Sequence, residues 1–111
     1  MKFIKERIYD ELLGDYIVRD ERIFSDCVEF ELKRIRNHAK ELILAAVPEY
    51  KQRNAALGLL SDAEITEIKN SIQTIRNTSN EKENDITSVV WNGTEETRAA
   101  ACDAVQAVRW E

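Results

Sequence analysis

Apolar residues recur at alternating steps of three and four along two stretches of the chain, which is the pattern of an amphipathic helix with one apolar stripe. The first stripe consists of Val28, Leu32, Ile35, Ala39, Leu42 and Ala46. The second consists of Ile65, Ile68, Ile72 and Ile75. The sequence therefore predicts two long helices whose stripes are covered by each other or by a second copy of the chain.

Helix-ending residues separate the two stretches. Ser25 or Asp26 is expected to cap the first long helix. Pro48 ends this helix, because proline lacks an N–H group and disfavours helical dihedral angles in the residue before it. A short helix is predicted to begin with Pro48 in its first turn and to end near Leu57, where Gly58 supplies a left-handed cap.

The second long helix is predicted over about residues 62–91. Ser61 and Glu64 have the spacing of a capping box, in which a hydroxyl and a carboxylate each accept a backbone N–H group. The apolar pattern weakens in the polar stretch 80–85, which is a predicted point of kinking or fraying because Ser and Asn compete for backbone hydrogen bonds. The pair Asn92-Gly93 is expected to end the helix.

A last helix is predicted to begin at Thr94 and to carry a face of mostly small residues. Because small side chains shorten the distance between packed helices, we expect this face to lie close to its neighbour. The face consists of Arg98, Ala101, Cys102, Val105, Val108 and Arg109.

The N-terminal segment has two interpretations. Residues 1–18 mix apolar and charged residues at helical spacing until Gly14-Asp15 interrupts them, which favours a short helix followed by a turn. The alternative is a short β-hairpin across Asp20-Glu21 that joins residues 16–18 to residues 22–24, since both triplets are rich in β-branched and aromatic residues.

Composition agrees with a helical fold. The 111 residues include three Gly and one Pro, which leaves few tight turns for an all-β fold, and only eight aromatic residues, which implies a thin aliphatic core. We therefore predict an all-α fold, a helical bundle or hairpin with one long coiled-coil-like helix. Residues 1–111 are expected to form a single helical domain. The alternative is that residues 1–24 form a separate N-terminal attachment segment.

Charge and hydropathy exclude two classes of partner. The net charge is −5 and no segment has a clear basic excess, so nucleic acid is not expected as a partner. Charged residues make up 33% of the chain and no apolar run is long enough to span a bilayer, so a soluble protein without a membrane partner is predicted. The N-terminal segment also lacks the long apolar region of a signal peptide.

The residues that usually carry catalysis are few. His38 is the single histidine, and Cys27 is about 16 Å from it along one predicted helix, so these two cannot pair within that helix. Cys102 can reach His38 only through tertiary packing, and reduced, buried thiols are the preferred state of both cysteines. The acidic clusters follow from composition. We predict no catalytic residue, no metal site and no cofactor.

The short helix after Pro48 has two interpretations. Tyr50, Arg53, Asn54 and Leu57 fall on adjacent faces, so an aromatic ring, a guanidinium and an amide can converge on one surface. In the structural interpretation Tyr50 and Leu57 dock on the bundle, and polar side chains, including Gln52, tie the helix to backbone carbonyls. In the functional interpretation the helix recognises a partner. The predicted partner-binding residues are Tyr50, Arg53, Asn54, Ile68, Ile72 and Ile75.

The segment 47–86 resembles the C-terminal region of small tail-associated proteins of bacteriophages. These proteins pair a Pro-aromatic-Lys-Gln-Arg-Asn motif with a later Ile-Arg-x-x-Ser-Asn motif that is followed by Glu. In this chain Glu49 stands between the proline and the aromatic residue, which departs from the motif. The matching residues are Pro48, Tyr50, Lys51, Gln52, Arg53, Asn54, Ile75, Arg76, Ser79, Asn80 and Glu83.

The resemblance implies a non-enzymatic virion structural or tail-assembly protein, located in the virion or the host cytoplasm. Its expected partners are other copies of the chain, as a homo-oligomer, or other phage tail proteins. The alternative is a small cytoplasmic phage regulator or inhibitor whose acidic surface binds a host protein.

Overall fold

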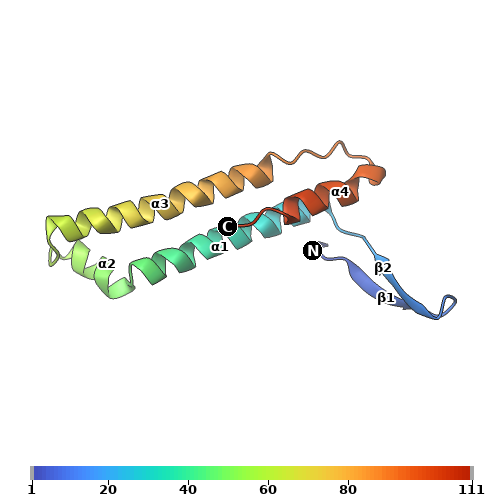
Figure 1. Ribbon diagram of the computed structural model, residues 1–111, viewed down its shortest axis with the longest axis horizontal. Helices are drawn as coiled ribbons and strands as arrows, with labels where there is room; N and C mark the ends of the chain where they lie inside the picture. Colours follow the sequence, from blue (N-terminus) through green and yellow to red (C-terminus); the bar gives the residue numbers. More distant parts are fainter. Residues whose placement is uncertain (1, 111) are drawn as a thin grey trace.

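The computed structural model describes residues 2–110 as an elongated molecule of 69 × 30 × 20 Å. Two strands come first along the chain and four helices follow (Figure 1). The elements are β1 (Glu6–Asp10), β2 (Asp15–Arg19), α1 (Phe24–Ala46), α2 (Glu49–Ala56), α3 (Asp62–Thr87) and α4 (Glu95–Gln106).

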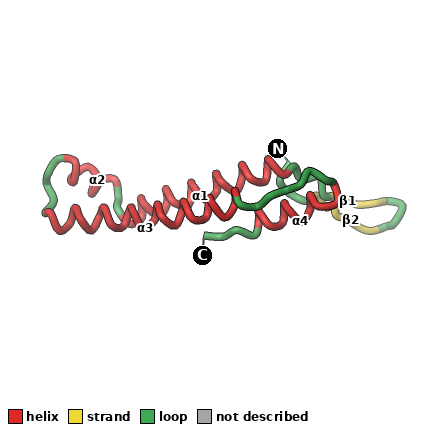
Figure 2. The backbone as a smooth tube through the Cα atoms, turned by 90° about the horizontal axis from the view of Figure 1, so that it is seen from above, coloured by secondary structure: helices red, strands yellow, loops and turns green. Residues whose placement is uncertain are grey.

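The helices α1 and α3 run side by side in opposite directions along the long axis, and α2 forms the connection between them at one end of the molecule (Figures 1 and 2). At the opposite end α4 folds back against α1. The strands β1 and β2 form a hairpin that projects away from the helices at this second end. The molecule is therefore a long helical hairpin with a third packed helix and a β-hairpin at one end.

The predicted all-α fold is wrong, because residues 6–19 contain the two-stranded antiparallel sheet. Both interpretations of the N-terminal segment are wrong in detail: there is no helix over residues 1–18 in the described part of the chain, and residues 16–18 pair with residues 7–9 rather than with residues 22–24. The hairpin register runs from Glu6 opposite Arg19 to Asp10 opposite Asp15.

Turn chemistry explains the hairpin. The Asp10 carboxylate accepts hydrogen bonds from the backbone N–H groups of Leu12, at 2.9 Å, and Leu13, at 3.2 Å. Gly14 has a φ angle of +63° and its N–H donates to the Asp10 carbonyl at 2.9 Å. An aspartate that binds the backbone two and three residues on, with a left-handed glycine, reverses the chain direction. Gly14 therefore closes a β-turn region instead of ending a helix.

The local signals for the later helices are confirmed. Ser61 and Glu64 form the capping box, with the Glu64 N–H donating to the Ser61 hydroxyl at 3.2 Å. Gly58 adopts the left-handed conformation after α2 with a φ angle of +73°. Pro48 separates α2 from α1 as predicted, but it precedes the helix as its cap residue and does not stand in the first turn.

Two helix boundaries differ from the prediction. No side-chain cap starts α1; the Asp26 carboxylate accepts instead from the backbone N–H of Lys2 at 2.8 Å, which ties the N-terminal segment to this helix. The helix α3 continues through the polar stretch 80–85 without a break and ends at Thr87, short of the predicted end near residue 91. An ion pair between Glu83 and Arg36 of α1 holds the polar stretch against the helical hairpin.

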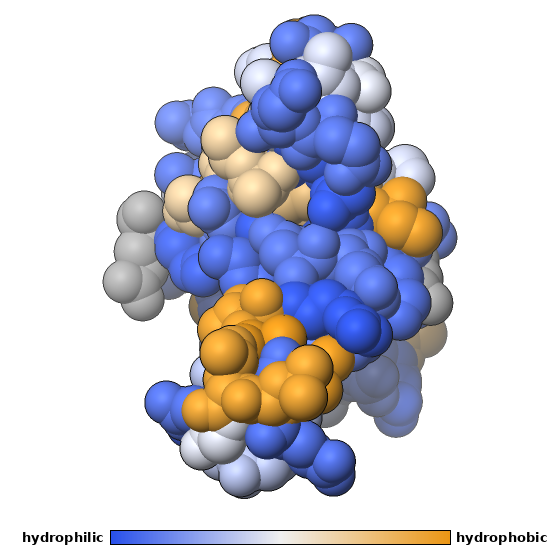
Figure 3. Space-filling model, turned by 90° about the vertical axis from the view of Figure 1, so that its right-hand side faces the viewer, coloured by the Kyte–Doolittle hydropathy of each residue, from blue (hydrophilic) through white to orange (hydrophobic). Residues whose placement is uncertain are grey.

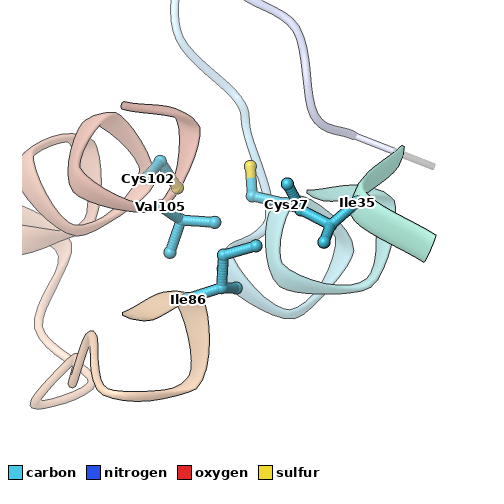
Figure 4. Packing of buried hydrophobic residues seen from close by; sticks show 5 residues of the cluster. All are labelled: Cys27, Ile35, Ile86, Cys102 and Val105. Atoms are coloured by element: carbon cyan, nitrogen blue, oxygen red, sulfur yellow. The ribbon is translucent and has the colours of Figure 1, made fainter. Parts of the chain in front are cut away.

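The core lies at the end where α1, α3 and α4 meet. Its five members are fully buried and point toward one another from the three helices (Figure 4). Each fully buried Ile or Val stabilises the fold by roughly 1.5–3 kcal/mol relative to an exposed position. The members are Cys27, Ile35, Ile86, Cys102 and Val105. The small-residue face predicted for the last helix supplies part of this core, with Ala101, Cys102 and Val105 buried.

Candidate protein-interaction site

Away from the core, the helical hairpin is thinly covered. Among residues 2–110, Val47 is the one buried residue between positions 40 and 78. In this part only α1 and α3 lie against each other, and two helices cannot cover both of their apolar stripes fully. The four isoleucines that we call the isoleucine seam are each half-buried: Ile65, Ile68, Ile72 and Ile75. The predicted seam exists, and it keeps apolar surface in contact with solvent.

The packing near α2 is also incomplete. A hollow of about 130 Å³ lies between the end of α1 and the start of α3. Ile68 lines it together with Ala46, Val47 and, from the α2 side, Lys51. The structure thus brings one residue of the isoleucine seam next to the short helix. Ile75 lies farther along α3, at roughly 10 Å from Ile68 at the standard helical rise.

The short helix α2 displays the predicted recognition residues. Tyr50 is 60% exposed and Leu57 is 66% exposed, so neither docks on the bundle as the structural interpretation expected. Of the polar side chains, Gln52 donates to the Val47 carbonyl at 2.7 Å. Within residues 2–110 the side chains of Arg53 and Asn54 form no hydrogen bond or ion pair. Their donors and acceptors are therefore available to another molecule.

The β-hairpin is a second exposed surface, which the sequence interpretation missed. The rings of Tyr9 and Tyr16 meet edge to face at 5.3 Å, and the Arg7 guanidinium lies 4.4 Å from the centre of the Tyr16 ring. Leu12 at the turn is 97% exposed and Leu13 is also exposed. Figure 3, which looks onto this end of the molecule, shows hydrophobic residues gathered in one patch low in the view.

A buried arginine anchors the hairpin to α4. Arg22 is 1% exposed, and its guanidinium binds the Asp20 carboxylate with two hydrogen bonds of 2.9 Å. It also donates to the Gln106 side chain at 2.6 Å and pairs with Asp103 at 2.7 Å, both on α4. Gln106 in turn donates to the backbone carbonyl of Phe3. The base of the hairpin is therefore fixed on the helices, while the strands project from it.

The charges in this anchor are mutually stabilised. The hydrogen bonds from Arg22 lower the pKa of Asp20 from 3.8 to about 2, against the opposing effect of burial. The same contacts raise the pKa of Arg22 above its usual value. Both groups are charged at neutral pH, so the guanidinium is buried with its counter-charge beside it.

The segment after α4 borders a groove on α1. Trp110 meets His38 edge to face at 5.1 Å, and the Arg34 guanidinium donates to the Val108 carbonyl at 2.7 Å. The groove has a volume of about 620 Å³, and Phe30 and Trp110 supply its apolar wall. His38 therefore lies at a groove on the surface and not in the core.

The cysteines are packed inside. Cys27 and Cys102 are free thiols with no exposed surface. Burial, with a contribution from the neighbouring Cys102 thiol, raises the pKa of Cys27 from 9.0 to about 12. A thiol with such a pKa carries almost no thiolate at neutral pH, and the thiolate is the reactive form. His38 is placed at the groove and both cysteines in the core, so the structure does not join them in one site.

Two further findings concern metal binding and membrane spanning in the described residues. No group of three or more His, Cys, Asp or Glu side chains within residues 2–110 is placed to hold a metal ion. None of the helices in this range has the length and apolar character needed to cross a bilayer.

Comparison of the chain with known protein families, curated proteins and solved structures gives no match. Fold and surface together define an elongated helical hairpin with two exposed regions, one at α2 and the isoleucine seam and one at the β-hairpin.

Proposed function

We propose that this protein is a non-enzymatic assembly component that packs its helical hairpin against another protein chain. The observation that carries the proposal is the isoleucine seam, which α1 covers only in part. Covering the part of each isoleucine side chain that is still exposed, which is the smaller part, stabilises a complex by up to about 4 kcal/mol in total, before the entropic cost of association. A helix from a partner can supply this cover by packing along α3 over the isoleucine seam.

The short helix α2 gives the contact its specificity. Tyr50 is a large, exposed aromatic side chain, and tyrosine and arginine are the residue types that most often dominate binding energy at interfaces. Arg53 can donate several hydrogen bonds in a fixed geometry. Because α2 adjoins the Ile68 end of the seam, one partner can contact both surfaces at the same time.

We place the partner in a bacteriophage tail, as another tail protein or a further copy of this chain. The resemblance to small tail-associated proteins covers residues 47–86, which include α2 and nearly all of α3. The exposed α2 side chains and the isoleucine seam both lie within this segment. The protein then acts during tail assembly in the host cytoplasm or remains in the virion.

The mass of the native protein and its binding to isolated tails test this proposal. We expect a stable oligomer by native mass spectrometry, or a monomer that co-sediments with purified tails of the phage that encodes it. A monomer that does not co-sediment with tails and forms a stoichiometric complex with one host protein contradicts the assembly role. That outcome favours the small regulator or inhibitor.

A further inference from the structure

The outer edge of β2 is open. Within residues 2–110, β2 pairs with β1 on one side only, and all five of its residues are exposed. An unpaired strand edge presents a row of backbone N–H and C=O groups that can pair with another strand. Proteins commonly block such edges with proline, a bulge or a charged residue in the middle of the strand. β2 has none of these, because its charged residues stand at its two ends and Tyr16, Ile17 and Val18 lie between them.

The charges of β2 are complementary to a second copy of the same strand. If two copies run antiparallel with Ile17 opposite Ile17, then Asp15 of each copy faces Arg19 of the other. Tyr16 faces Val18 in the same register. Both charged contacts are attractive, and opposite charges across an antiparallel pair stabilise it.

The other possible pairings are worse. If β1 pairs with a second β1 about Ile8, Glu6 of each copy faces Asp10 of the other, and like charges directly opposite destabilise a sheet. If β1 pairs with β2 of another copy in the register of the monomer, Asp10 faces Asp15. That contact also leaves β2 free on one copy and β1 free on the other, and these two edges can repeat the same contact with further copies, so it extends without closing.

We propose that β2 is a self-recognition edge, which pairs antiparallel with β2 of a second copy about a two-fold axis at Ile17. The product is a four-stranded sheet in the order β1, β2, β2, β1. One face then carries a continuous row of Ile8 and Ile17 from both copies. The other face carries the Tyr9 and Tyr16 rings beside Val18 and Arg7 of the second copy.

Strand number gives a second reason for this pairing. An isolated two-stranded hairpin is marginally stable in water, and three or more strands with an apolar face are needed for independent stability. The β-hairpin of this protein projects from the helices, and in the described part of the chain neither of its strands pairs with a third strand (Figure 1). Self-pairing through β2 doubles the strand number and covers Ile17. This contact uses a surface separate from the isoleucine seam and goes beyond the function proposed above.

Disulfide cross-linking of the full chain tests the register. In the Ile17→Cys variant the two new thiols face each other across the axis, where opposite Cβ atoms lie about 4.5–5.5 Å apart. That separation is close to what a disulfide needs. We expect mild oxidation to give a covalent dimer. The matched control is Leu12→Cys, which is more exposed but lies about 30 Å from its counterpart in this register at the rise of an extended strand. The native cysteines remain in place, since both are buried.

A charge exchange tests the pairing without cross-linking. Arg19→Asp turns both attractive contacts into repulsive ones, and we expect the dimer to weaken about tenfold by analytical ultracentrifugation. Adding Asp15→Arg to the same chain restores opposite charges at both contacts and should recover most of the affinity. Circular dichroism checks that each variant keeps its fold.

Two results would overturn the inference. One is cross-linking of Ile17→Cys no faster than that of Leu12→Cys. The other is a double variant that stays as weak as Arg19→Asp. None of these substitutions touches α3, so their failure leaves assembly through the isoleucine seam intact and identifies the strand contact alone as wrong.

Discussion

The carboxylate of Asp20 accepts two hydrogen bonds of 2.9 Å from the guanidinium of Arg22, one from Nε and one from Nη2. The two residues are close in sequence, yet their contact connects distant elements, because Arg22 also binds Asp103 and Gln106 on α4. This pair fixes the position at which the β-hairpin is attached to the helices. Its contribution to the stability of the protein can be measured as a function of pH.

The pKa of Asp20 makes stability depend on acid. Its value in the folded protein, about 2, lies below its ordinary 3.8, so the contribution is complete above about pH 4 and is lost as the pH falls toward 2. Since Asp20 is partly solvated, we expect this contribution to be on the order of 1–2 kcal/mol. The Asp20→Asn variant should unfold more easily in urea at pH 7 and show a smaller drop between pH 5 and pH 2.5.

The control for this measurement is Glu67→Gln, which removes one exposed carboxylate from α3. It should keep the acid dependence of the wild type. An Asp20→Asn variant with the same loss of stability between pH 5 and pH 2.5 as the wild type would show that Asp20 is not held by Arg22.

The two cysteines give a direct test of the core. Both are fully buried, and the raised pKa of Cys27, about 12, keeps its thiol protonated at pH 8. We expect no reaction of either thiol with Ellman's reagent in the folded protein and two reacting thiols per chain in denaturant. The Leu12→Cys variant supplies an exposed thiol that should react at once. Rapid labelling of a native cysteine without denaturant would contradict the packing of α4 on α1.

The polar residues Arg53 and Asn54 of α2 should matter for binding and not for folding. Arg53→Ala with Asn54→Ala removes side chains that form no hydrogen bond or ion pair within residues 2–110, so helix content by circular dichroism should not change. Loss of interface hydrogen bonds should weaken partner docking about tenfold or more. The matched control replaces two exposed residues of α3, Lys69→Ala with Asn70→Ala. Equal partner affinity of both double variants would remove α2 from the recognition surface.

Local chemistry could be predicted from the sequence because each signal needs only a few neighbouring residues. The Ser61 and Glu64 capping box, the break at Pro48 and the left-handed Gly58 are of this kind. The heptad-like spacing likewise located the isoleucine seam. How much of the isoleucine seam is covered could not be predicted, because this depends on how many helices pack around α3. The helix α4 packs against α1 at the end of the molecule away from the seam.

The β-hairpin could not be predicted for a different reason. Hydrophobic alternation indicates a strand when one of its faces is buried and the other is solvated. Here both faces of the hairpin stand in solvent, so Ile8 and Tyr9 on successive faces are both apolar and no alternation results. Ile8 and Leu12 then fall at helical spacing by chance. The useful signal was Asp10 four residues before Gly14, which fits the turn that the structure forms.

The Ile72→Asp variant tests most directly whether the isoleucine seam is a packing surface. Its melting temperature and native mass should be compared with those of Asn70→Asp, which adds the same carboxylate at an exposed position of α3. We expect Asn70→Asp to match the wild type. Ile72→Asp should melt at a lower temperature and lose its assembly, because an unpaired charge enters an apolar surface. An Ile72→Asp variant with wild-type melting temperature and wild-type mass would show that the isoleucine seam is not a packing surface.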